Sequence, residues 1–231
     1  MKFAVDLHMH SCLSPCGDMD MTPNNIVNMC KLKELDMIAV TDHNTAGQLR
    51  PIKLIADAIG IGLLPGMELT TAEDAHMLAY FRTVDEAIAF SDEIYPHLPN
   101  IKNKPSLFGT QAFMNDDDEI VGEEPKLLLN ALDLSIDKLF NMVKERGGLA
   151  IPAHINRGTN GILQALGFLP PDIPFPALEV TKGLPLPHKG IPDVKQLHSS
   201  DAHYLENIFE REEFLDLAAP TPDAFFDYIL S

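Results

Sequence analysis

The chain has 231 residues, 45% of them hydrophobic, and its 34 acidic and 17 basic residues give a formal net charge of −17. This length fits a single α/β domain with a small insertion, and no apolar run approaches the ~20 residues that a membrane-spanning helix needs. The acidic balance argues against long nucleic acids as partners, since their binding rests on Lys and Arg. No apolar stretch of signal-peptide length stands near the N-terminus, so we expect a cytoplasmic protein without a membrane partner.

Seven short apolar runs predict strands. They cover residues 3–10, 37–43, 62–70, 75–81, 149–155, 177–183 and 194–203. Continuous runs of this length are typical of strands that are buried on both faces, as in a parallel sheet. Most of these runs carry, at one end, a polar residue that can take part in chemistry.

Helical patterns lie between several of the runs. The segment 22–35 begins with Thr22 as an N-cap and Pro23 at the first helical position, and similar patterns cover 47–60 and 135–148. Strands and helices in alternation predict a parallel α/β fold. Seven such strands indicate a barrel, in which active-site groups gather at the carboxyl ends of the strands.

Residues 97–131 interrupt this alternation. Within them, the stretch NDDDEIVGEEP at 115–125 is acidic and rich in turn residues. Two interpretations remain open for this insertion. It is either a β-hairpin that packs over the site as a lid, or a solvated loop.

Residue types that can bind metals stand beside most of the predicted strands. His8 and His10 end the first strand, and residues two apart on a strand point to the same side, so the pair can grip one ion. The later runs add Asp42, His43, Glu68, His76, His154, Asp201 and His203. Imidazole and carboxylate groups together suit zinc, manganese or iron. A carboxylate such as Glu68 can also bridge two ions, as two-metal catalysis requires at a separation of about 3.5–4 Å.

The placement of the histidines is informative as a set. Six of the nine histidines stand at strand ends, whereas chance placement would scatter them. A single histidine near a strand is more often a packed or exposed residue than a ligand. We give that ordinary interpretation to His97, His188 and His198.

These motifs resemble the PHP superfamily, named for polymerase and histidinol phosphatase. The stretches DLHMHS, TDHN, GMELT, HMLAY, AHINR and SSDAH follow the family order from residue 5 to about residue 203. The resemblance implies a single domain over residues 1–231 with a distorted (β/α)7 TIM-like barrel. It also implies a metal site at the C-terminal ends of the strands, two or three Mn, Zn or Fe ions, and hydrolysis of phosphate esters.

The resemblance implies a specific distribution of ligands. One ion would be held by His8, His10, Glu68 and Asp201. Glu68 would bridge to a second ion, which it would share with His76 and His154. A third ion would be held by His43 and His203 together with one residue from the loop that follows His10.

The loop after His10 is where the sequence departs from the family. Many members have Ser-Asp-Gly five residues after the second histidine, and Pro15 takes that place here. The candidates for the missing ligand are Asp18, which we place first, Cys16 and Asp20. The chain has three cysteines, too few for a disulfide framework.

The family chemistry also requires groups that act on the substrate. Arg157, three residues after His154, is our first choice for orienting the phosphate, and Lys182 is the second. Asp42 is expected to orient a metal ligand through a hydrogen bond, without contacting the metal itself. The alternative for Asp42 is a cap on the following helix.

The sequence therefore favours a phosphatase that acts on a small phosphorylated molecule or a nucleotide. Three alternatives remain. They are an amidohydrolase, a non-catalytic metal-binding regulatory module, and a nuclease or nucleotide phosphodiesterase of the same family. The pair Asp201 and His203 favours the phosphoesterase over the amidohydrolase. An amidohydrolase usually has a single aspartate late in the chain instead of such a pair.

Overall fold

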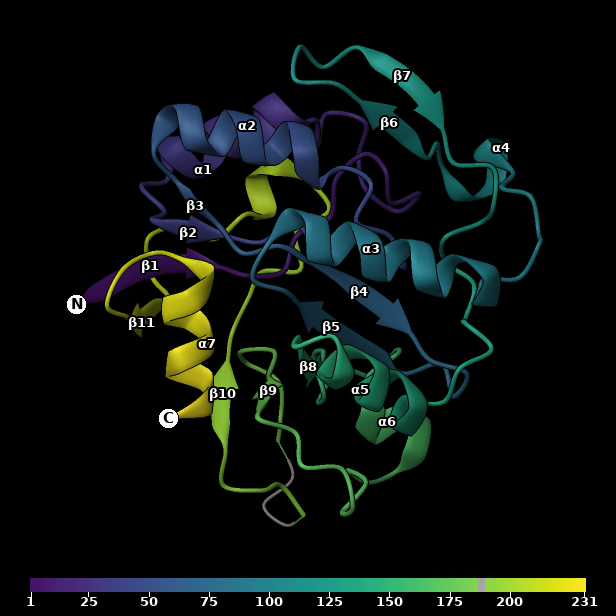
Figure 1. The fold of residues 1–231 in the computed structure, drawn as a ribbon, viewed down its shortest axis with the longest axis vertical. Helices are drawn as coiled ribbons and strands as arrows, with labels where there is room; N and C mark the ends of the chain where they lie inside the picture. The colour runs from purple at the N-terminus through teal and green to yellow at the C-terminus, as the bar shows by residue number, and fades with distance from the viewer. Residues whose placement is uncertain (187–189) are drawn as a thin grey trace.

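The computed structural model describes residues 1–186 and 190–231, so the prediction for His188 lies outside the described residues. Strands occur in all seven predicted runs (Figure 1). They are β1 (Lys2–Asp6), β2 (Met37–Ile38), β3 (Gly62–Leu63), β4 (Gly66–Thr70), β5 (His76–Tyr80), β8 (Leu149–Pro152), β9 (Ala177–Glu179) and β10 (Lys195–Leu197). The third run is divided between β3 and β4 at Leu64 and Pro65, because proline cannot donate a ladder hydrogen bond.

The strands form a mixed α/β fold. β1, β2 and β3 pair in parallel, as do β9 and β10, and β11 (Phe214–Asp216) adds an antiparallel edge to β1. Strand pairs among the described residues form four separate sheets. Isolated bridges between Met9 and Ala202 and between His43 and Glu68 connect strand ends.

One strand runs against the predicted direction. The sequence predicted a parallel fold, but β5 pairs antiparallel with both β4 and β8. The reason is the connection: only residues 71–75 join β4 to β5, and a parallel crossover needs a dozen residues or more. As a result His76, the first residue of β5, lies opposite Thr70 at the end of β4.

The three predicted helices are present. They are α1 (Pro23–Leu32), α2 (Leu49–Ile59) and α5 (Ile136–Glu145). The Thr22 side chain caps α1 by accepting from the amide of Asn25, as the sequence predicted. Gly60 ends α2 with a φ of 79°, a left-handed conformation that glycine adopts without strain. No described helix is long and apolar enough to span a bilayer.

Other helices were not predicted. They are α3 (Val84–Ile94), α4 (Pro105–Phe108), α6 (Ile162–Leu166), α7 (Pro222–Leu230) and the 3-10 turns at Tyr95–His97 and Leu205–Asn207. α3 begins with a capping box between Thr83 and Glu86, a signal that is readable in the sequence. α7 packs near the start of β1, so both ends of the described chain lie on one side of the fold (Figure 1).

A hairpin of β6 (Ala112–Met114) and β7 (Ile120–Glu123) occupies the 97–131 insertion. It packs against the loop that follows β1. The amide of Ala112 donates to the carbonyl of Cys12 at 3.2 Å, and Asp118 accepts from the Thr22 hydroxyl at 2.6 Å. From this insertion, Leu129 contributes to the lining of the central cavity. The hairpin strands therefore brace the loop, and a lid function stays a prediction.

Candidate metal centre

Glu68 lies at the middle of the site, in the centre of β4, and is 1% exposed. Five imidazoles surround its carboxylate, and its two oxygens face different rings. Oε1 lies 2.8 Å from Nδ1 of His76, 3.0 Å from Nε2 of His154 and 3.4 Å from Nε2 of His8. Oε2 lies 3.1 Å from Nδ1 of His43 and 3.3 Å from Nε2 of His10. One buried carboxylate thus links two sets of histidine ligands.

Asp201 joins the pair of histidines from the start of the chain. Its Oδ1 lies 3.1 Å from Nε2 of His10 and 3.4 Å from Nε2 of His8, and these two nitrogens are 3.3 Å apart. His154 and Asp201 both have positive φ, 28° and 52°. Such strained backbone outside glycine persists where the surroundings enforce it, typically at functional sites.

The donor set fits divalent cations. Among the described residues, His43 Nδ1, His76 Nδ1 and Asp201 Oδ1 are buried and lie 2.8–3.1 Å from a polar atom of the cluster, but none of these contacts has the geometry of a hydrogen bond. Buried polar atoms normally form hydrogen bonds, so this close packing of potential ligand atoms fits a bound cation. Three groups have ligand atoms within 4.8 Å of one another, namely His8–His10–Asp201, His43–Glu68–His76 and His10–Cys16–His43–His203. Their nitrogen, oxygen and sulfur donors suit Zn, Mn or Fe.

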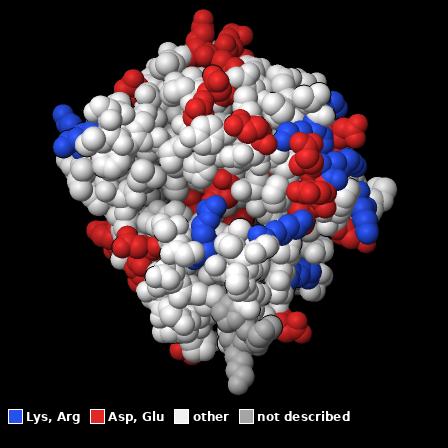
Figure 2. All heavy atoms as spheres, turned by 180° about the vertical axis from the view of Figure 1, so that it is seen from behind, with Lys and Arg blue, Asp and Glu red and all other residues white. Residues whose placement is uncertain are grey.

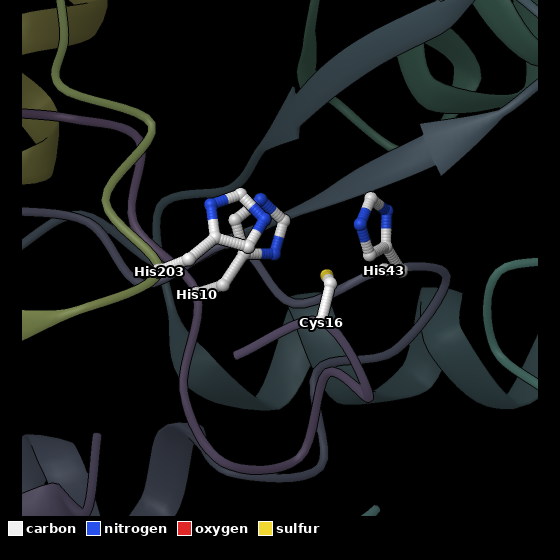
Figure 3. A group of neighbouring side chains, drawn as sticks. All are labelled: His10, Cys16, His43 and His203. Atoms are coloured by element: carbon white, nitrogen blue, oxygen red, sulfur yellow. The ribbon is translucent and has the colours of Figure 1, made fainter. Parts of the chain in front are cut away.

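Cys16 and not Asp18 lies in the third group. Figure 3 shows the Cys16 thiol directed at the space between the rings of His10 and His43. The Asp18 carboxylate instead accepts from the amide of Asp20 at 2.8 Å, in an exposed hydrogen bond. The structure therefore does not support our first choice for the loop ligand. Asp20 is exposed, so Cys16 is the loop candidate that lies among the histidines.

Burial and the neighbouring charged groups shift the pKa values of the acidic side chains in the centre. Burial alone would raise the pKa of Glu68, but His76, His8 and His43 outweigh it and hold that pKa well below its usual range. Burial also opposes ionisation of Asp201, yet His8 and His10 keep its pKa lowered. Burial raises the pKa of the Cys16 thiol, and the charges of Glu68 and Asp42 add to this effect.

Glu179 was missed by the sequence analysis. It ends β9, is 3% exposed, and its two oxygens lie 3.0 and 3.1 Å from Nδ1 of His8. It also accepts from the amide of His154 at 2.8 Å. A carboxylate on one ring nitrogen fixes the tautomer and aims the other nitrogen at the metal. The readable signal was a glutamate inside the apolar run 177–183.

Asp42 is connected to His10 through a serine. It is 3% exposed and accepts from both the amide and the hydroxyl of Ser11, at 2.8 and 2.6 Å. It also accepts from the Ser14 hydroxyl at 2.6 Å, and that hydroxyl lies 3.1 Å from Nδ1 of His10. The cap of α2 is Gln48, so the helix-cap alternative for Asp42 is wrong.

The two proposed substrate cations lie in different places. Arg157 lines a cavity of about 330 Å³ above the histidines, where its Nη1 donates to Oδ2 of Asp201. Lys182 pairs with Glu213 and lies over the ring of Phe209, away from the residues that line this cavity. On the face in Figure 2, Lys and Arg side chains are interspersed with acidic ones.

No family model matches this chain. An uncharacterized protein of Methanocaldococcus jannaschii is 31% identical over 77 residues, which are 30% of this chain and 45% of that protein. Among solved structures, the lesion-specific endonuclease PfuEndoQ from Pyrococcus furiosus is 20% identical with a TM-score of 0.70. That match covers 100% of this chain and 56% of PfuEndoQ. Endonuclease Q has also been solved with a 27-mer duplex substrate that has an abasic lesion at the active site.

Two shorter structures match along nearly their whole length. A putative metal-dependent phosphoesterase from Bifidobacterium adolescentis is 18% identical with a TM-score of 0.59, over 98% of this chain and 95% of its own. An amidohydrolase from Chromobacterium violaceum is 15% identical with a TM-score of 0.56, over 97% and 95%. The chain spans about half the length of the first two proteins named. At identities of 15–20%, these neighbours show a shared fold, and in this chain that fold buries the histidine cluster.

Proposed function

We propose that this chain is a metal-dependent hydrolase of phosphate esters with a bi- or trinuclear centre in a distorted seven-stranded barrel. The supporting observation is the carboxylate of Glu68, which is buried between two sets of imidazoles. Such an arrangement is costly for folding unless cations occupy it, because buried polar atoms without partners are destabilising.

The residues for each ion follow the family resemblance, and the observed groups overlap with them. The first ion would be held by His8, His10, Glu68 and Asp201. The second would be held by Glu68, His76 and His154, and the third by His43 and His203 with a loop residue. Bound Mn, Zn or Fe ions would polarise the phosphate and lower the pKa of a coordinated water.

The remaining residues of the chain would orient these groups. Glu179 holds the Nδ1 proton of His8 and so leaves Nε2 free to face the centre. Asp42 does the same for His10 through Ser14. Arg157 stands at the cavity and can exchange its contact with Asp201 for two oxygens of a phosphate, since guanidinium binds phosphate in a bidentate way.

We propose a small phosphomonoester or a nucleotide as the substrate. A cavity of about 330 Å³ suits a small molecule, and the interspersed charges of the Figure 2 face do not make a continuous basic track. A DNA phosphodiester is the second candidate. It is favoured by the fold shared with Endonuclease Q, which was solved with lesion-containing duplex DNA.

The test is a substrate panel with the metal-loaded protein. The panel contains phosphomonoesters, nucleotides, a phosphodiester, abasic duplex DNA and an amide. We expect phosphate release from monoesters, and loss of that release in Glu68→Gln but not in the exposed control Glu212→Gln. Cleavage of abasic DNA alone would make the second candidate correct, amide hydrolysis alone would favour the amidohydrolase, and binding of metal without any turnover would identify a non-catalytic module.

A further inference from the structure

Cys16 shares a compact space with three imidazoles. The ring centroids of His10 and His43 are 4.5 Å apart, those of His10 and His203 are 4.4 Å apart, and all four residues offer ligand atoms within 4.8 Å of one another. His43 is 4% exposed, and its Nδ1 lies 3.1 Å from Oε2 of Glu68 without the geometry of a hydrogen bond. Cys16, His43 and His203 also line the central cavity, so a cation can reach the group from solvent.

The loop that carries Cys16 is tightly fixed. The amide of Gly17 donates to the carbonyl of Ser14 at 2.9 Å, and the amide of Asp18 donates to the carbonyl of His203 at 2.9 Å. A Cβ at Gly17 would lie 2.3 Å from the carbonyl oxygen of Ser11, so only glycine fits this turn. The thiol is therefore presented to the histidines by a rigid turn, as a preorganised ligand is.

We propose that Cys16, His43 and His203, which lie beside His10, form a thiolate-containing cation site that takes Zn²⁺ in preference to Mn²⁺ or Mg²⁺. This inference rests on the proposed function and specifies the metal of its third site. A thiolate is a soft ligand, which zinc prefers far more than manganese or magnesium do. Binding displaces the thiol proton to solvent, because the metal ligand is the thiolate.

The first experiment uses Co²⁺ as a spectroscopic substitute for Zn²⁺. Metal-free protein titrated with Co²⁺ should develop a sulfur-to-cobalt charge-transfer band in the near ultraviolet. Cys16→Ser should lose this band. Two controls should keep it: Asp18→Asn, and Cys30→Ala, which removes the buried thiol of α1. No band in the wild type at saturating Co²⁺, or an unchanged band in Cys16→Ser, would overturn the proposal.

The second experiment measures metal preference without an activity assay. Metal-free protein is dialysed against equal Zn²⁺ and Mn²⁺, and its metal content is determined by elemental analysis. Cys16→Asp keeps a ligand at this position but replaces sulfur by oxygen, so it should exchange part of the bound zinc for manganese. The same zinc content in Cys16→Asp and the wild type would contradict a thiolate-selected site.

A third measurement needs only the wild type and so does not depend on the folding of any variant. Zn²⁺ should protect Cys16 from alkylation by iodoacetamide, as mapped by mass spectrometry. Equal alkylation with and without Zn²⁺ would contradict the proposal. The thiolate site and the phosphoesterase proposal fail separately. A charge-transfer band without hydrolysis refutes the enzyme, and hydrolysis without a band refutes the thiolate ligand.

Discussion

Glu179 and His8 form a buried hydrogen bond at the end of β9, in which both carboxylate oxygens lie within 3.1 Å of Nδ1. Burial raises the pKa of Glu179, but the charge of His8 outweighs it and holds that pKa below its usual value. The two residues are 171 positions apart in the chain. The contact fixes which nitrogen of His8 faces Glu68. A residue at the end of β9 therefore determines the orientation of a histidine that follows β1.

Glu179→Gln is expected to weaken metal binding without removing a ligand. An amide cannot hold the Nδ1 proton of His8 as a carboxylate does, and loss of such a partner typically lowers metal affinity by about 10–100-fold. Competition with a chelating dye measures this affinity. The exposed Glu212→Gln is the control. Equal affinities in Glu179→Gln and the wild type would show that Glu179 only fills space.

Ser14→Ala tests the link between Asp42 and His10. The substitution leaves buried Asp42 with one donor fewer, which should cost about 1–3 kcal/mol of unfolding free energy. Urea denaturation of metal-free protein gives this value. His10 should also lose affinity for its ion, because its Nδ1 partner is gone. The control is Ser106→Ala, at an exposed position in α4, which should change neither quantity.

The sequence was sufficient for the positions of the strands and for most of the residues that gather at the candidate metal centre, because both depend on local pattern. The apolar runs carry His8, Glu68 and His154 within two residues of their ends, and the structure brings these side chains together. The direction of β5 was also implicit, since the five-residue turn before His76 is too short for a crossover. The general α/β alternation of the sequence predicts a parallel strand there instead.

Other features depend on contacts between distant segments. Cys16 and Asp18 follow His10 by six and eight residues, and what separates them in space is the turn that Gly17 permits against Ser11. Likewise, Glu179 looks like an isolated acid in an apolar run until β9 is placed beside His8. No local pattern in a single sequence encodes such pairings.

Metal should stabilise the fold. Ligands that bind only the native state add about 2.7 kcal/mol at a hundredfold excess over Kd, which corresponds to a rise in Tm of about 5–10 °C at this size. Elemental analysis of protein purified without chelator should find at least two ions per chain, and a chelator should reverse the gain in Tm. Glu68→Gln should show a much smaller response, because Glu68 faces both histidine sets. A wild-type Tm that is insensitive to Zn²⁺, Mn²⁺ and chelator would contradict the centre.

Arg157→Ala separates substrate binding from metal binding. Arg157 is 38% exposed and contacts Asp201 through one nitrogen, so the remaining guanidinium donors are free to face the cavity. Its loss should leave metal content and Tm near the wild-type values. It should still remove about 2–4 kcal/mol of transition-state stabilisation, a loss of roughly 10²–10³-fold in kcat/KM, as for other preorganised donors.

Arg157→Lys should recover only part of that loss, because an ammonium cannot bind two phosphate oxygens in the fixed geometry of a guanidinium. The matched control is Arg50→Ala, which removes an exposed arginine paired with Asp85 on the surface. Steady-state kinetics on the best ester of the panel and elemental analysis are carried out on each variant. Wild-type kinetics in Arg157→Ala would remove Arg157 from substrate recognition. A drop in metal content would show instead that Arg157 acts by holding Asp201 in place.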